Sequence, residues 1–142
     1  MDSRKSRMAK NIRHKIKNLK IHSDSRGWLI ELLKANEIEK PLKQLHIASI
    51  KPGFVRGNHY HKKRIEWLFL VSGKAKVVLE DVATKKRKNF IFNEKSPKVL
   101  SIFPGISHAV KNIGTKNAYI ISAQSDIFNP KKPDKTLYKV IE

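Results

Sequence analysis

The chain has 142 residues, of which 39% are hydrophobic and 30% charged, a balance that supports one folded domain and excludes wholesale disorder. Zero cysteines exclude disulfides and thiolate chemistry, and no apolar run approaches the roughly 20 residues needed to span a bilayer. Because the basic N-terminus also lacks the apolar segment of a signal peptide, we expect a cytoplasmic protein that has no contact with membranes.

Lys and Arg outnumber Asp and Glu by 31 to 12, which gives a formal net charge of +19. Three explanations stay open: the lysine-rich surface of a protein from a heat-adapted organism, steering of a phosphorylated substrate, or nucleic-acid binding. No zinc-finger or ribonucleoprotein-type motif occurs in the sequence, which argues against specific nucleic-acid recognition.

The N-terminal part of the chain changes character near residue 20. Residues 1–20 are polar and basic and predict a loose arm or a short leading element, so we place the folded domain at residues 21–142. The turn residues Asp24-Ser25-Arg26-Gly27 precede Trp28–Leu33, an apolar run of strand length. Ala35–Leu42 is either a short helix or a loop.

Short strands dominate the rest of the chain. Trp67–Val71 and Lys74–Glu80, joined by Ser72-Gly73, are the clearest candidate for a hairpin. The other expected strands are Leu45–Ile50, Asn89–Asn93, Lys98–Phe103, Ile106–Asn112 and Asn117–Ala123, with a possible edge strand at Leu137–Ile141. This spacing of turns, with little helix, is typical of an all-β antiparallel sandwich or barrel.

Three histidines and one glutamate occupy suggestive positions. His59 and His61 are two residues apart, which places both imidazoles on one face of a strand. Glu66 directly precedes the next strand, and His108 lies on the inward face of its own. Taken singly, His108 is better explained as a satisfied core residue and the His59/His61 pair as a surface pair. Together, three imidazoles and a carboxylate would form a divalent transition-metal site with positions open for water or substrate.

Two motifs support this combination. Gly53-x(5)-His59-x-His61-x(4)-Glu66-x(6)-Gly73 matches the first cupin motif at every fixed position, and Pro104-Gly105-x(2)-His108-x(3)-Asn112 matches the core of the second. Lys98 replaces the leading glycine of the second motif. The chain therefore resembles the cupin superfamily, which implies a double-stranded β-helix (jelly-roll) barrel and commonly a homodimer. The resemblance also implies that His59, His61, Glu66 and His108 bind a metal; we favour zinc over nickel, manganese or iron.

A closer resemblance begins near Ser23. Asp24-Ser25-Arg26-Gly27-Trp28, Arg56-Gly57-Asn58-His59-Tyr60-His61 and Phe128-Asn129-Pro130 are similar to cupins that act on nucleotide sugars. Among these, the chain resembles the C-terminal cupin domain of the capsular-polysaccharide assembling proteins, a metal-binding epimerase of UDP-linked 4-keto sugars. The dTDP-4-keto-rhamnose 3,5-epimerases and dTDP-sugar 3,4-ketoisomerases are similar at greater distance. The resemblance implies an epimerase or isomerase of a nucleotide-linked 4-keto sugar in surface-polysaccharide biosynthesis, served by a separate reductase.

Two departures separate the chain from the 3,5-epimerases. His61 stands where those enzymes carry Gln, and the region of Ile127 and Phe128 lacks their tyrosine hydroxyl. We therefore do not expect their double-epimerisation mechanism here.

A metal at the four ligands would polarise the sugar's carbonyl, so the base that removes the adjacent proton must be a residue that does not bind the metal. His46 is the candidate base and Tyr119 the candidate acid, although a solvated edge histidine and a core tyrosine are the plainer explanations. Arg56, Lys62 and Lys63 are candidates to bind the diphosphate, or else form an ordinary solvated face.

Two other functions stay open at this point. One is a non-catalytic module that binds a metal or a sugar nucleotide and partners a reductase. The other is a cupin dioxygenase, which also uses three histidines and one glutamate, but around iron.

Overall fold

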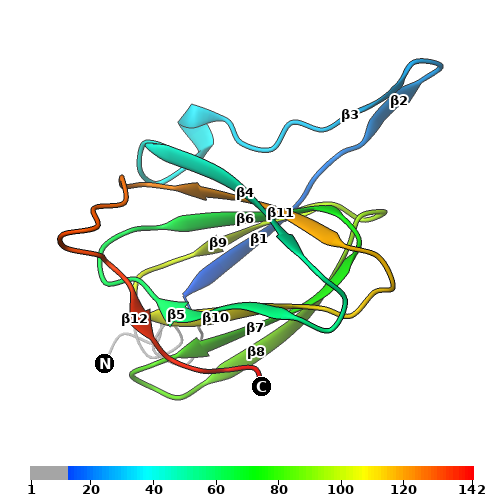
Figure 1. Ribbon diagram of the computed structural model, residues 1–142. Helices are drawn as coiled ribbons and strands as arrows, with labels where there is room; N and C mark the ends of the chain where they lie inside the picture. Colours follow the sequence, from blue (N-terminus) through cyan, green and yellow to red (C-terminus); the bar gives the residue numbers. More distant parts are fainter. Residues whose placement is uncertain (1–12) are drawn as a thin grey trace, which may run out of the picture.

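The computed structural model describes residues 13–142, and the part of the expected arm that precedes residue 13 lies outside them. Two five-stranded antiparallel sheets face each other (Figure 1). In spatial order, the first sheet contains β1 (His14–Asn18), β9 (Lys98–Ile102), β6 (Glu66–Ser72), β11 (Ala118–Gln124) and β4 (Gln44–Ile50). The second contains β12 (Thr136–Leu137), β5 (Val55–Tyr60), β10 (Ile106–Asn112), β7 (Lys74–Asp81) and β8 (Arg87–Asn93). This architecture confirms the predicted all-β cupin jelly roll.

Alternation along each strand puts apolar side chains between the two sheets. This interior is filled by buried residues from both layers, among them Leu68, Leu79, Leu100, Ile106 and Ile120. The outer face of the first sheet carries a second apolar cluster around Trp67 and Phe69, which the segment after residue 30 partly covers with Leu32, Leu33 and Ile38. Both faces of β6 are therefore apolar, which explains its continuous hydrophobic run.

The predicted hairpin of Trp67–Val71 and Lys74–Glu80 was wrong, although both strands exist. β6 pairs with β9 and β11 in the first sheet, whereas β7 pairs with β8 and β10 in the second. Gly73, with a φ of 103°, is the corner at which the chain passes from one sheet to the other. A Cβ at Gly73 would lie 3.1 Å from the Cα of Ala118, so the corner requires glycine.

The N-terminal segments also differ from expectation. Residues 14–18 form β1, a leading element that pairs with β9 along its whole length. Only Trp28 and Leu29 of the apolar run become part of a strand, β3 (Gly27–Leu29), which pairs with β2 (His22–Asp24) in a two-stranded ribbon outside both sheets (Figure 1). The segment Ala35–Leu42 contains one short 3-10 turn, η1 (Ala35–Glu37). The leucines after β3 pack on the outer face of the first sheet as an irregular segment, not as a strand.

Residues 134–141, which we call the C-terminal strap, cross the outer face of the second sheet. Only β12 pairs with β5; the expected strand at Leu137–Ile141 is otherwise replaced by hydrogen bonds to Asn58. The amides of Val140 and Ile141 donate to Asn58 Oδ1 at 2.8 and 3.0 Å, and Asn58 Nδ2 donates to the carbonyl of Ile141 at 2.9 Å. The strap therefore fixes the backbone of β5 just before His59.

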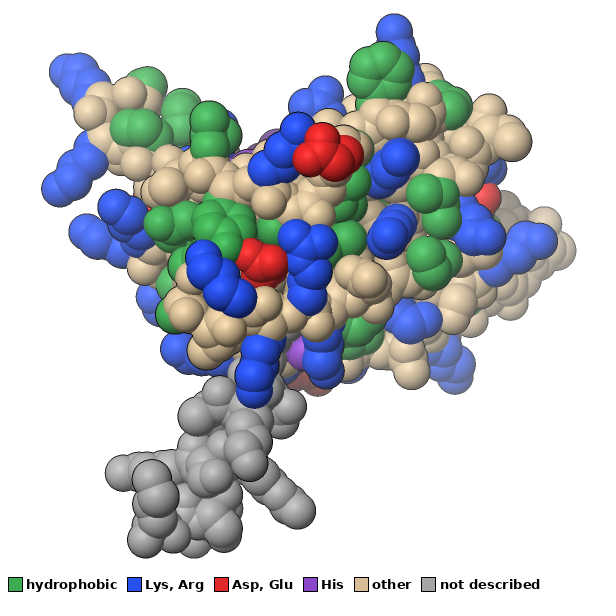
Figure 2. All heavy atoms as spheres, turned by 90° about the horizontal axis from the view of Figure 1, so that it is seen from below, with side chains coloured by type: hydrophobic (Ala, Val, Ile, Leu, Met, Phe, Trp, Pro, Cys, Tyr) green, Lys and Arg blue, Asp and Glu red, His purple; other side chains and the backbone are tan. Residues whose placement is uncertain are grey.

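Basic side chains are spread over the surface. Figure 2 shows Lys and Arg scattered among uncharged and hydrophobic side chains over the face seen from below, where they do not form a continuous stripe. No helix in the part of the chain from residue 13 to 142 is long and apolar enough to cross a membrane.

Candidate metal centre

The four predicted ligands meet at one end of the barrel, where β6 and β10 begin and β5 ends. His59 pairs with His108 across β5 and β10, and the register shifts directly after this pair. Gly57, with a φ of 101°, permits the close approach of the two strands, because a Cβ there would lie 2.6 Å from the carbonyl oxygen of His108. The glycine before the first histidine is therefore part of how the site is built.

One ligand atom from each of His59, His61, Glu66 and His108 lies within 4.8 Å of the other three. Glu66 Oε2 is 2.7 Å from His108 Nε2 and 3.3 Å from His61 Nε2. His61, Glu66 and His108 are buried, while His59 is half-buried at the mouth. The structure thus brings together the four residues that the motifs selected.

Hydrogen bonds outside the cluster set how the rings face. His61 Nδ1 lies 2.6 Å from the carbonyl oxygen of Asp134, and His108 Nδ1 lies 3.2 Å from that of Ile106. Because a carbonyl only accepts, each Nδ1 carries a proton, and in the neutral ring Nε2 then turns a lone pair toward Glu66. Ser122 Oγ donates to the other carboxylate oxygen, Oε1, at 2.5 Å.

The electrostatics of the cluster favour a bound cation. Burial opposes the charge of Glu66, but His108 and His61 outweigh it and hold the pKa of Glu66 well below its usual value. Burial, followed by the charge of His108, lowers the pKa of His59 to about 4, so His59 is neutral and able to act as a ligand at neutral pH. Burial works against the charged form of His108 as well, yet Glu66 raises its pKa.

The geometry around His108 provides a test of whether a metal fits. His108 Nε2 is buried and has no directed hydrogen bond, although a carboxylate oxygen lies 2.7 Å away. A lone pair and an anionic oxygen at this distance repel each other unless a proton or a metal ion supplies positive charge at the pair. Three imidazoles and a carboxylate are also a donor set typical of divalent transition metals. The residues therefore fit a metal ion.

A polar cavity of about 320 Å³ opens beside the cluster. Besides His59, His61 and Glu66, its walls include His46, Arg64, Gln124, Phe128 and Lys135. His46 lies on β4 opposite Ser122 of β11, the residue that binds Glu66. The candidate base is thus at the cavity, and the aromatic ring of Phe128 forms part of the same wall.

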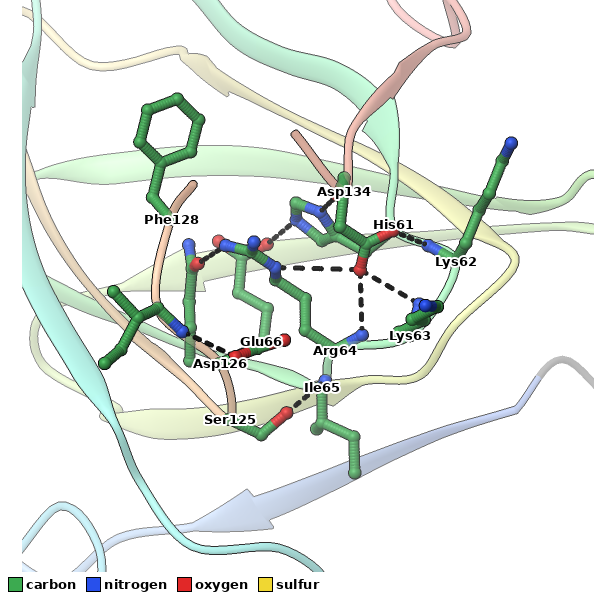
Figure 3. Close-up of polar contacts among 12 residues, drawn as sticks. His61, Lys62, Lys63, Arg64, Ile65, Glu66, Ser125, Asp126, Phe128 and Asp134 are labelled. Atoms are coloured by element: carbon green, nitrogen blue, oxygen red, sulfur yellow. Dashed lines mark hydrogen bonds and ion pairs between the residues drawn. The ribbon is translucent and has the colours of Figure 1, made fainter. Parts of the chain in front are cut away.

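The structure does not bring the other candidates into the cavity. Tyr119 alternates with the inward residues of β11 and lies on the outer face, 41% exposed. Arg56 Nε donates to the carbonyl of Ser49, away from the cavity walls. Lys62 and Lys63 are exposed and do not line the cavity. Their backbone amides donate to the carboxylate of Asp134 at 2.7 and 2.9 Å (Figure 3).

Sequence reasoning missed Arg64, Gln124 and Lys135 as residues of the cavity and Asp134 as the partner of His61. Side-chain alternation could have identified Arg64, because it is two residues before Glu66 and so shares its side of the chain. Asp134 had no comparable signal, since it lies 73 residues from His61.

Comparison with known proteins gives consistent results. A family model described as the polysaccharide biosynthesis C-terminal domain matches residues 22–136. The chain is 32% identical over 127 residues to the spore coat polysaccharide biosynthesis protein SpsL of Bacillus subtilis. The aligned region covers 85% of this chain and 84% of that protein.

Two solved structures show similar folds. A 3,4-ketoisomerase from Helicobacter canadensis is 28% identical, with a TM-score of 0.76 over 89% of this chain and 91% of that one. The capsular polysaccharide assembling protein CapF from Staphylococcus aureus is 26% identical, with a TM-score of 0.68 over 86% of this chain. The matched region is 34% of CapF, so the chain spans about a third of that protein. These matches confirm the resemblance that the motifs predicted.

Proposed function

Because the chain belongs to the polysaccharide biosynthesis C-terminal domain family, we propose that it is a metal-dependent isomerase or epimerase of a nucleotide-linked 4-keto sugar in surface-polysaccharide biosynthesis. The observation that carries the proposal is the convergence of three imidazoles and a carboxylate beside a polar cavity. The names of SpsL and CapF support the class of pathway, and that of the ketoisomerase supports the class of reaction.

In this proposal His59, His61, Glu66 and His108 hold a divalent transition metal, with zinc favoured over nickel, manganese or iron. Such an ion supplies Lewis-acid polarisation of the sugar's carbonyl when bound. The carboxylate of Glu66 balances part of its charge, and the carbonyls of Asp134 and Ile106 hold two of the rings with Nε2 facing inward.

The base must come from outside the ligand set, within reach of a proton on the carbon next to the carbonyl. Among the described residues, His46 is the histidine that lines the cavity without belonging to the ligand cluster. We assign the base to His46. Tyr119 does not enter the proposal, because its side chain lies on the outer face of the first sheet.

The diphosphate of the substrate is anionic and leaves the cavity toward solvent. Lys135 lines the cavity wall, and Lys62 and Lys63 are exposed in the loop directly after His61. We propose that these lysines, together with Arg56 near the start of β5, provide the positive charge that attracts the diphosphate.

A second copy of the chain is the partner we propose for the outer face of the first sheet. A groove of about 720 Å³, lined mainly by apolar side chains such as Trp28, Phe69 and Ile121, lies between the ribbon and this sheet. Leu45 and Ile47 on the edge strand β4 are 61% and 65% exposed next to it in the fold.

The proposal also includes a separate sugar-nucleotide reductase and a cytoplasmic location, which a chain without cysteine suits.

The decisive experiment follows solvent deuterium into UDP- and dTDP-linked 4-keto-hexoses incubated with the zinc-loaded protein. Deuterium at C3 with the ketone still at C4 indicates an epimerase, whereas a ketone moved to C3 indicates a ketoisomerase. His46→Gln should slow either reaction by about 100-fold or more while zinc stays bound. Metal binding without any exchange would contradict the proposal and favour a non-catalytic module, and bound iron with oxygen uptake would favour a dioxygenase.

A further inference from the structure

Arg64 is a buried cation in the wall of the cavity. It precedes Glu66 by two residues in the link between β5 and β6, and its side chain is 5% exposed. In Figure 3 a dashed line joins the guanidinium group of Arg64 to the carboxylate of Asp134. The charge thus stands in the same cavity as three of the proposed metal ligands.

The protein leaves part of this guanidinium without a partner. Nη1 donates to the side-chain oxygen of Gln124 at 2.5 Å, but the buried Nε has no hydrogen-bond partner. The closest carboxylate oxygen, Asp134 Oδ2, is 3.7 Å from Nε and already accepts the backbone amides of Lys63 and Arg64 at 2.9 and 3.1 Å. Asp134 is therefore occupied with holding the loop and does not neutralise Arg64 at close range.

A structural role explains this arrangement poorly. Burying a guanidinium costs free energy, and the cost is recovered only when its N–H groups are paired with good geometry. A neutral amide and a long ion pair do not provide such pairing. A cation whose burial is not compensated within the fold, and which lines a cavity, is suited to bind an anionic ligand that enters the cavity.

We propose that Arg64 is a catalytic residue that donates a hydrogen bond to the substrate oxygen on which negative charge develops during the reaction. This inference rests on the proposed function. When the base takes the proton from the carbon next to the carbonyl, the C–H electron pair forms a carbon–carbon double bond and the carbonyl π pair moves onto oxygen. The resulting enolate oxygen accepts from Arg64, and reprotonation at carbon reverses the electron shift.

The planar fork of a guanidinium suits this ligand. If the carbon next to the carbonyl also carries a hydroxyl, loss of its C–H proton gives an enediolate whose two neighbouring oxygens lie in one plane, a shape that Arg recognises with paired donors and Lys does not. This predicts that charge alone is insufficient at position 64.

The test compares Arg64→Met, Arg64→Lys and the control Lys88→Gln, an exposed substitution on β8. We expect Arg64→Met to lower kcat for deuterium exchange by about 100-fold with little change in KM and with zinc content unchanged. Arg64→Lys should recover only part of that loss. Lys88→Gln should have the kcat and KM of the wild type. Removal of a poorly paired buried cation should leave the thermal midpoint equal or higher.

A binding measurement separates this inference from the proposed function. Oxalate, a planar dianion with adjacent oxygens, serves as the probe in calorimetric titrations of the zinc-loaded proteins. Weakening of oxalate affinity by about 10-fold or more in Arg64→Met supports anion binding even if no keto sugar undergoes exchange, a result that would overturn the proposed function instead. Unchanged kcat and oxalate affinity, or loss of zinc and of thermal stability in Arg64→Met, would overturn the role of Arg64.

Discussion

The ribbon of β2 and β3 lies outside the two sheets and the C-terminal strap crosses the outer face of the second, and the two are attached to the molecule in opposite ways (Figure 1). In the strap, Asn58 binds the backbone of Val140 and Ile141, and Ser107 Oγ donates to the carbonyl of Tyr138 at 2.6 Å. In the ribbon, Trp28 and Leu29 are 63% and 58% exposed. The strap is fixed by polar contacts and positions β5 and His61, whereas the ribbon displays apolar surface that a partner would cover.

The largest effect is expected at Asn58, where the strap is attached. Asn58→Gly removes three hydrogen bonds while tolerating the φ of 57°, so we expect unfolding free energy to fall by about 2–3 kcal/mol. Asn58→Ala should lose roughly 1 kcal/mol more, because a Cβ is strained in the left-handed region. Urea unfolding of the two variants measures both effects. Wild-type stability in Asn58→Gly would show that the strap is not held by this side chain.

A smaller, pH-dependent effect is expected at Glu80. It accepts a hydrogen bond from the hydroxyl of Tyr138 in the strap and pairs with Arg87 Nε at 2.9 Å. The Tyr138 hydrogen bond is the main cause that lowers the pKa of Glu80 below its ordinary 4.5. The ionised carboxylate therefore stabilises the fold above pH 4.5, and this contribution is lost as the pH falls through the lowered native value.

Glu80→Gln measures that contribution. We expect the wild type to exceed the variant by about 1 kcal/mol at pH 7, with the difference shrinking at successive pH values below 4.5. Urea unfolding of both proteins over this range provides the comparison. A difference that grows as the pH falls would contradict the assigned contact.

The smallest effect on folding is expected in the ribbon. Trp28→Ser should change the unfolding free energy of the monomer by less than about 0.5 kcal/mol, because the indole is mostly exposed. The same change should weaken self-association in sedimentation experiments if a second copy covers the groove. Ile91→Ser, 54% exposed on β8, is the matched control. Equal self-association of both variants would place the dimer interface elsewhere.

How much of this could be predicted from the sequence depends on the range of the contacts involved. The convergence of the four candidate ligands was predictable because spacing and parity within short motifs place His59, His61 and Glu66 near one another, and the second motif adds His108. The pairing of the strands on either side of Gly73 was not predictable, since a Ser-Gly corner looks the same whether the chain folds back or changes sheet.

Parity also failed where both faces of a strand are apolar. β11 reads Ala118-Tyr119-Ile120-Ile121, and its outer face packs in a second apolar cluster, so alternation did not show that Tyr119 points outward. The apolar run from Trp28 predicts a strand because residues that pack irregularly on the outer face of a sheet have the same composition as those of a strand. Asp134 binds a loop about 70 residues away, a contact set by the fold alone.

The most direct test of the account is the metal content of the purified protein, measured by elemental analysis together with zinc titration of the wild type, His108→Ala and Lys88→Gln. We predict about one divalent ion per chain in the wild type and in Lys88→Gln, and a loss of zinc affinity of more than about 100-fold in His108→Ala, because the buried Nε2 beside Glu66 is one of the four proposed ligand atoms. Equal zinc affinity in His108→Ala and the wild type would contradict the proposed metal centre.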